Sequence, residues 1–335
     1  MNNRPATLGL SAILASAICF SGCSNLTSSS TITNTAPATV AYMLDSPSTT
    51  IVGYSTVSPN TGSSVGTFTL PSSYWAGPVA TDSTGQIYVA GFGDPANPQS
   101  LGDVFIYPPD SAGAATPSRT IDVDSDQIDA LTVDPAGLLY VAINTVSAAP
   151  PTVNVYSATA SGTATPLRTL QLTDVLQIYD IAADGAGNIY VVTGNAIAVY
   201  PPTANGPSTP IRTINIVGPG VYGVAIDAAG NIFASVCLDS NNTDFAIEEF
   251  APGADGTAAP INAISLIPAS PWSIVDAGPV RLDGAGNIFT ALLLFSTQPG
   301  DNNATVVYGF APTATGNTAP TVQITARFNT YFALN

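Results

Sequence analysis

The sequence predicts an all-β domain assembled from six similar units of four antiparallel strands. Three observations support this. A short apolar segment ending in an Asp-x-x-Gly turn recurs along the chain, Gly and Pro are abundant and dispersed, and the two chain ends together complete one further unit. Of 335 residues, 45% are hydrophobic, 8% are charged, 29 are Gly and 28 are Pro. Such a composition is typical of many short strands joined by tight turns.

The first half of each unit is a predicted hairpin. Its pattern is an apolar strand, Asp, two residues, Gly, one residue and an apolar–aromatic pair, repeated at intervals of roughly 50 residues. The turn aspartates are Asp82, Asp134, Asp184, Asp227 and Asp283. Asp can accept hydrogen bonds from its own turn, and Gly supplies the positive φ that the turn needs. We therefore interpret these aspartates as turn residues rather than metal ligands.

The second half of each unit adds two more strands. An aromatic residue closes the third strand, a proline follows ten residues later, and a fourth strand begins after it. The closing aromatics are Tyr107, Tyr156, Tyr200, Phe250 and Phe310. In three copies the fourth strand starts with an arginine, namely Arg119, Arg168 and Arg212, whose partners the sequence does not identify. Four antiparallel strands per repeat predict the blades of a β-propeller, with strands A to D running from the axis outward.

The chain ends supply the sixth unit. Residues 331–335 match the A strands, whereas residues 40–43, 50–54 and 66–70 match strands B, C and D. Joining one C-terminal strand to three N-terminal strands would close the ring and leave no open edge. The prediction is therefore a six-bladed β-propeller over residues 38–335.

The A–B hairpins resemble the NHL repeat. Residues 223–233, Gly-Val-Ala-Ile-Asp-Ala-Ala-Gly-Asn-Ile-Phe, carry this resemblance most clearly. It implies the propeller fold. The acidic, Asn and Arg pattern that usually follows in that family is missing here, so the resemblance implies no particular function.

The N-terminal segment predicts export. Residues 1–22 read as a lipoprotein signal peptide with one arginine and a 13-residue apolar stretch. The alternatives are a buried helix and a transmembrane anchor, and the stretch is short for spanning a bilayer. Residues 20–23, Phe-Ser-Gly-Cys, resemble a lipobox, which implies lipidation of Cys23. Residues 23–37 would form a flexible tether rich in Ser, Thr and Asn.

This resemblance implies a cell-envelope protein anchored in the membrane through Cys23. Ser24 follows the lipidated position, a pattern that implies the outer membrane in a Gram-negative cell. Cys19 would leave with the signal, so Cys237 would have no partner and is interpreted as a buried thiol. We expect a monomer.

Charge and residue usage exclude several function classes. The net charge is −16, the six basic residues are all arginines, and histidine is absent. Nucleic-acid binding needs basic groups against phosphates, so we exclude it. Without histidine there is no Ser-His-Asp or Cys-His chemistry, and no catalytic residue is predicted.

Loop lengths indicate which face could bind. The A–B and C–D connections keep their lengths, and they share one face, which we call the turn face. The B–C and D–A connections vary and form the opposite, variable-loop face, as expected of binding loops on a rigid scaffold or of neutral drift. That face gathers carboxylates and rings, which suit a sugar or a cationic group. The expected ligand-binding residues are Tyr74, Trp75, Asp126, Asp129, Tyr179, Asp180, Tyr222, Trp272, Arg281 and Phe328. The alternative is that the rings, with Tyr331, fill the wedges between blades.

Arg281 is unusual among the A strands because the aligned positions hold only Ala or Thr. A long cation there must reach the central channel or be paired, since an unpaired buried charge is costly.

A metal site has weaker support. Asp122, Asp124 and Asp126 alternate, as calcium ligands can, but the Gly of an EF-hand loop is missing, so we expect no cofactor. Propellers of the gluconolactonase type hold a metal with axial Glu, Asn and Asp, whereas Glu248 and Glu249 fall in a C strand. Streptogramin-lyase-like propellers use histidine.

The sequence thus favours a non-catalytic lipoprotein that binds a glycan, peptide or protein. A metal-dependent hydrolase or lyase and a structural scaffold are the alternatives.

Overall fold

The computed structural model describes residues 39–45, 49–57, 61–71, 74–93, 102–125, 127–145, 149–296, 304–326 and 331–335. They belong to a compact unit, Pro37–Asn335. Every regular element among them is a β-strand, and none of them forms a helix long and apolar enough to cross a membrane. The predicted signal peptide, Cys23 and the tether lie outside the described residues.

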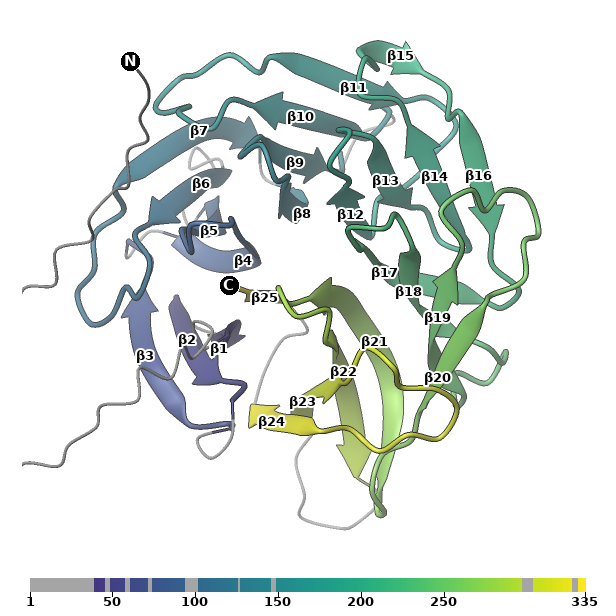
Figure 1. Cartoon of the computed structure of the whole chain (residues 1–335). Helices are drawn as coiled ribbons and strands as arrows, with labels where there is room; N and C mark the ends of the chain where they lie inside the picture. The colour runs from purple at the N-terminus through teal and green to yellow at the C-terminus, as the bar shows by residue number, and fades with distance from the viewer. Residues whose placement is uncertain are drawn as a thin grey trace, which may run out of the picture. The chain divides into compact units, whose positions relative to one another are not determined.

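Six sheets surround a central axis, as predicted, so the fold is a six-bladed β-propeller (Figure 1). Blades 1 to 5 are numbered in chain order, and each runs from strand A at the axis to strand D at the rim. Blades 1 and 2 consist of β4 (Tyr74–Thr81), β5 (Ile87–Gly93), β6 (Gly102–Tyr107), β7 (Arg119–Ser125), then β8 (Ile128–Val133), β9 (Leu139–Ile143), β10 (Thr152–Tyr156) and β11 (Arg168–Leu172).

The next two blades repeat this order. They consist of β12 (Asp180–Ala183), β13 (Ile189–Val192), β14 (Ala196–Tyr200), β16 (Arg212–Asn215), then β17 (Gly220–Ile226), β18 (Ile232–Cys237), β19 (Phe245–Phe250) and β20 (Asn262–Leu266). A short extra strand, β15 (Gly206–Ser208), leaves the C–D connection of blade 3 and pairs in parallel with β11 of blade 2. Equivalent single bridges, such as Ile121 with Gly162, link other neighbouring blades.

Blade 5 has a longer inner hairpin than the others. Its strands are β21 (Trp272–Leu282), β22 (Ile288–Ser296), β23 (Ala304–Phe310) and β24 (Val322–Ala326). The sequence indicated only that the D–A connections vary in length, whereas here β21 spans 11 residues and β22 nine. Part of the extra length is therefore strand rather than loop, and two register shifts in β21 accommodate it.

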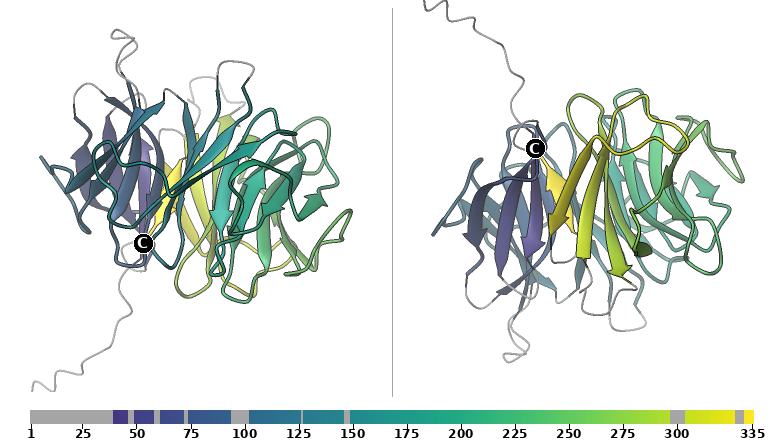
Figure 2. Two further views of the ribbon diagram at one scale, coloured as in Figure 1. Left: turned by 90° about the horizontal axis from the view of Figure 1, so that it is seen from above. Right: turned by 90° about the horizontal axis from the view of Figure 1, so that it is seen from below.

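The last blade combines both ends of the chain. Its A strand is β25 (Phe332–Leu334), followed by β1 (Val40–Asp45), β2 (Thr50–Ser55) and β3 (Ser64–Thr69). Ala41, Tyr42 and Met43 pair with Leu334, Ala333 and Phe332. The predicted closure is confirmed, and Figure 2 shows the resulting disc edge-on, with strands running between its two loop-bearing faces.

The A–B turns have the geometry that the motif predicted. In the first, Asp82 Oδ1 accepts hydrogen bonds from the backbone N–H groups of Thr84 and Gln86, and Gly85 has φ +82°. The other four turns repeat these contacts and also carry positive-φ glycines. The aspartates are therefore turn residues.

The arginines that start three D strands now have partners. Arg212 donates to the Tyr190 hydroxyl at 3.0 Å and to the Ala254 carbonyl of the next blade at 3.2 Å. Tyr190 in turn donates to its turn residue Asp184 at 3.3 Å. A B-strand tyrosine thus bridges the distance between the inner turn and the outer arginine, and the arginine ties two blades together.

Candidate functional site

The inner strands bring one equivalent position from every blade to the axis. Counted back four residues from the turn Asp, or from Asn335, these positions are Pro78, Ala130, Asp180, Gly223, Pro279 and Tyr331. Five of the six line a pocket, together with Val79, Asp129, Tyr179, Arg281 and Phe332. Asp180 is the first residue of β12 and Tyr331 directly precedes β25. Because A strands begin at the variable-loop face, the pocket lies towards that end of the axis.

Asp180 and Arg281 form a bidentate ion pair in this pocket. The two guanidinium nitrogens lie 2.9 and 3.1 Å from the two carboxylate oxygens. The backbone N–H of Val224 also donates to Asp180, at 3.0 Å. The side chain of Asp180 is only 4% exposed and that of Arg281 20%. Of the two alternatives left open for Arg281, the structure shows pairing inside the channel.

This pair spans three blades, because Asp180 comes from blade 3, Val224 from blade 4 and Arg281 from blade 5. Gly223 occupies the axial position of blade 4. A Cβ there would lie 2.4 Å from the Cα of Pro279, so the close approach of blades 4 and 5 requires glycine.

Asp129 is the second carboxylate of the pocket. Asn144 lies beside it, with its backbone N–H donating to the Gln127 carbonyl at 3.1 Å and its side chain forming reciprocal hydrogen bonds with the backbone of Ile178, at 2.8 and 2.9 Å. The Oδ2 atom of Asp129 is buried and has no hydrogen-bond partner among the described residues. Burial raises the pKa of Asp129, and the hydrogen bonds from Asn144 only partly oppose this.

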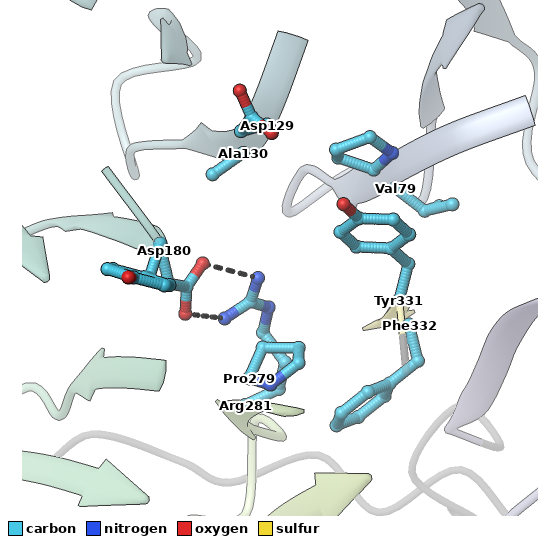
Figure 3. Close-up of a pocket in the computed structure, with 10 residues that line it drawn as sticks. Val79, Asp129, Ala130, Asp180, Pro279, Arg281, Tyr331 and Phe332 are labelled. Atoms are coloured by element: carbon cyan, nitrogen blue, oxygen red, sulfur yellow. Dashed lines mark hydrogen bonds and ion pairs between the residues drawn. The ribbon is translucent and has the colours of Figure 1, made fainter. Parts of the chain in front are cut away.

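Tyr331 faces the ion pair across the pocket (Figure 3). Burial raises its pKa to about 12, and the negative charges of Asp129 and Asp180 add to the rise. Figure 3 shows Asp129 and Ala130 on a third side of the pocket. The cavity volume of about 20 Å³ is enough for roughly one water molecule.

A second group of polar aromatic residues adjoins this pocket through Tyr179. Tyr179 lines the pocket and is 45% exposed. Burial raises the pKa of Tyr222, and the negative charge of Asp276 and the nearby Tyr179 contribute. Burial also raises the pKa of Asp276. Tyr179, Tyr222 and Asp276 therefore extend the acidic, aromatic surface from the axis over blades 4 and 5.

The remaining predicted ligand residues are separate from the pocket or outside the described residues. Tyr74 donates to Asp103 at 2.6 Å and its ring packs on Phe105, so both ends of its side chain have structural partners. Trp272 is half-buried against the blade 4–5 core, as Tyr222 is, whereas Trp75 is 56% exposed. Asp126 and Phe328 lie outside the described residues.

The structure adds residues that sequence reasoning did not select. Pro78, Pro279 and Ala130 complete the pocket wall, and Asn144 lies beside Asp129. Aligning the repeats on the turn Asp could have found the axial positions, because all six lie four residues before that Asp or before Asn335. Asn144 carries no such signal, since its role depends on contacts with Asp129 and Ile178.

The described residues contain no group of three or more acidic or cysteine side chains placed to hold a metal ion. Glu248 and Glu249 lie in β19, a C strand away from the axis, as the sequence indicated. Cys237 is buried, and its thiol contacts the carbonyl of Asp239.

Large exposed apolar side chains are more frequent on the variable-loop face. Of 13 in the described residues, eight lie in its loops or in adjoining strand ends. These are Trp75, Leu176, Tyr179, Val217, Leu238, Ile267, Val275 and Phe295.

Comparison with solved structures agrees with the fold. A Bacteroides caccae protein of unknown function has a TM-score of 0.58 and 10% identity, covering 89% of this chain and 99% of its own. A Lactobacillus plantarum protein has a TM-score of 0.56 and 13% identity, with the same coverages of 89% and 99%. The WD40 propeller domain of Doa1 has a TM-score of 0.50 and 12% identity, covering 82% and 86%.

At such low identities the likeness shows the fold alone. No protein-family model and no curated protein matches the chain.

Proposed function

We propose that this protein is a non-catalytic lipoprotein of the cell envelope whose propeller binds a ligand or partner on the variable-loop face. A single observation carries the proposal. The axial pocket on that side is lined by Asp129, by Tyr331 and by the Asp180–Arg281 ion pair. A concave site with a few convergent polar groups is the usual place for a bound ligand.

The surface around the pocket supports a ligand larger than the pocket itself. Tyr179 links the axis to Tyr222 and Asp276, and Trp75 is exposed on blade 1. Aromatic rings next to carboxylates can stack on a sugar or attract a cationic group. A glycan, a peptide or a protein loop could use the same surface.

The described chain enters the propeller at the turn face. Val40 begins β1 beside Asn335, where its backbone N–H donates to the Asn335 side chain at 2.8 Å. This is the A–B end of the composite blade, so the chain joins the propeller at the turn face. We propose that residues 23–37 are a tether whose lipidated Cys23 lies in the outer membrane.

Binding can be tested with a panel of neutral oligosaccharides and short peptides, measured by calorimetry on the purified protein. We expect at least one probe to bind, and Tyr179→Ala to weaken it by tenfold or more, since stacking on one ring contributes about 1–3 kcal/mol. Leu167→Ala is the matched control, because Leu167 is 62% exposed but lies on the turn face. Equal losses in both variants, or binding unaffected by Tyr179→Ala, would reject the site.

A further inference from the structure

The large exposed apolar side chains of the variable-loop face gather on one half of it. Seven of the eight, all except Trp75, belong to blades 3 to 5 or to the connections that lead into them, and these blades are neighbours in the ring (Figure 1). Leu176 and Val217 lie on the connections into blades 3 and 4, and Val275 and Phe295 lie in the long inner hairpin of blade 5. We call the variable-loop side of these three blades the apolar half.

These side chains contribute little to the fold. A core residue stabilises because folding removes its apolar surface from water, whereas Leu176 is 100% exposed and Val217 81%. The five large exposed apolar residues of the turn face are spread over four blades instead. Single exposed apolar residues need no partner, but a group of them on one surface indicates an interaction site.

The charges of the apolar half are complementary to a cation. Apart from the Asp180–Arg281 pair, its described charged residues are all acidic. Asp174 and Asp244 are exposed, Asp276 is half-buried, and none of these three forms an ion pair with a described residue. Complementary charges across an interface select the partner and speed its association. A partner of this surface therefore needs basic groups beside its apolar ones.

This combination decides between the ligand classes. A sugar contacts proteins through its hydroxyl groups and by stacking on aromatic rings, whereas five of the seven exposed apolar residues are aliphatic. A bilayer with anionic lipids would bury aliphatic side chains but would repel the carboxylates. A polypeptide segment with both apolar and basic side chains meets both requirements.

We propose that the apolar half binds a basic, apolar segment of a partner protein, with Leu176, Val217 and Val275 in apolar contact and Asp174 and Asp276 facing its basic groups. This inference rests on the proposed function and specifies the partner among the glycan, peptide and protein classes. Tyr179 belongs to the apolar half and also lines the axial pocket, so the segment lies across the mouth of that pocket.

The test begins with a displayed library of random peptides, about twelve residues long, selected on the purified full-length protein. The best binders are synthesised, and their affinities for variants are measured by fluorescence anisotropy. The triple variant Leu176→Ser, Val217→Ser, Val275→Ser should fold, because all three side chains are exposed. It should bind the peptides about tenfold more weakly or worse, since it removes three apolar contacts.

The matched control is the triple variant Leu167→Ser, Ile211→Ser, Ile261→Ser. These residues are 60–62% exposed on the turn face, and both triple variants keep the charge of the wild type. The control should bind the peptides as the wild type does, so attraction to the net negative charge alone cannot give the expected result. Equal affinities of the two triple variants would overturn the proposal.

The charge requirement has its own measurement. The selected peptides should carry net positive charge and large apolar side chains, and Asp174→Asn, Asp276→Asn should weaken their binding about threefold or more. The same double variant should make binding less sensitive to NaCl, because salt screens exposed charges. Peptides without net positive charge, or an affinity unchanged in the double variant, would contradict the assignment.

Other occupants give different results. If the wild type self-associates in sedimentation and the Leu176, Val217, Val275 variant does not, the surface meets a second copy of the chain and the proposal falls. It falls also if phosphatidylcholine vesicles displace the bound peptide, because the occupant is then a lipid surface.

Failure of this inference can be separated from failure of the proposed function. If no peptide binds through the apolar half but a neutral oligosaccharide binds in a Tyr179-dependent manner, the variable-loop site stands and the assignment of a protein segment falls. If neither class of probe binds, both fall.

Discussion

Asp180 and Arg281 lie 101 residues apart in the chain and form a bidentate ion pair beside the propeller axis, with Val224 of the intervening blade donating to the same carboxylate. The contact joins blades 3, 4 and 5 where their inner strands converge. Its properties lead to the first of five predictions.

Removing one partner of this pair should destabilise the protein. Arg281→Met leaves the buried Asp180 charge with one backbone donor, so we expect the free energy of unfolding to fall by about 3 kcal/mol. Urea denaturation measures it. The double variant Asp180→Asn, Arg281→Met should recover part of the loss, because no charge then remains unpaired. A double variant as unstable as the sum of both single variants would contradict the buried pair.

Asp129→Asn should stabilise the protein at neutral pH. Burial raises the pKa of the wild-type Asp129 carboxyl in the folded state. This carboxyl therefore stabilises the fold fully below its unfolded pKa, and the stabilisation is lost as the pH rises through the folded pKa. The asparagine lacks the desolvated charge and should gain about 1 kcal/mol at pH 7, with little difference near pH 3. Thermal melts across this range test it. A destabilised variant at pH 7 would show that the charge is compensated.

Alkaline pH should unfold the protein between about pH 10 and 12. Burial raises the pKa of Tyr107, Tyr200 and Tyr331 to about 12, so folding keeps these phenols protonated. Their contribution is complete below the unfolded pKa near 10 and is lost as the pH rises through the folded pKa. Phenolate absorbance and circular dichroism should therefore change together. Full ionisation near pH 10 without unfolding would contradict this.

The hydrogen-bonded contact between blades 3 and 4 should depend on Arg212. Arg212→Met removes hydrogen bonds to Tyr190 and Ala254, so the unfolding free energy should fall by about 1–3 kcal/mol. Arg212→Asn should lose less, because Asn262 makes the equivalent contact in the next blade, donating to Ala314 at 2.9 Å. Since Arg212 contacts the Tyr190 hydroxyl, a double-mutant cycle with Tyr190→Phe should give a coupling above about 0.5 kcal/mol. Additive effects would show that the contact contributes nothing.

Closure of the propeller ring by the C-terminal strand should depend on Phe332. Its side chain is 1% exposed in the core between blade 5 and the composite blade, so Phe332→Ala should cost about 3–5 kcal/mol. Val217→Ala is the control, because Val217 is 81% exposed. Calorimetric melting of both variants tests the ring. A variant at position 332 that melts like the control would mean that the closing strand is not needed.

The fold was predictable from the sequence because its signals are local and repeated. Each Asp-x-x-Gly turn specifies a hairpin, and the fixed offset from aromatic to proline specifies the outer pair of strands. The closure followed from register alone, since Asn335 falls where a turn Asp would be. The strand character of residues 272–282 was not predicted, because bulges break the alternation of buried and exposed residues there.

The site was predictable only in part. Asp129, Tyr179, Asp180 and Arg281 do meet, because A strands converge on the axis. Tyr74, Trp75 and Trp272 begin β4 and β21 on the same face, but where each ring settles depends on neighbouring strands, which sequence spacing does not encode. The partner of Arg281 depends equally on the geometry of three blades.

The closing strand has a consequence for how the pocket comes into being. Tyr331 and Phe332, two of its walls, belong to the last five residues of the chain, whereas Asp129 and Asp180 are synthesised long before them. A chain that lacks these two residues keeps both carboxylates but loses the phenol and the Phe332 side of the pocket. The pocket is therefore complete only when the closing strand has paired with β1.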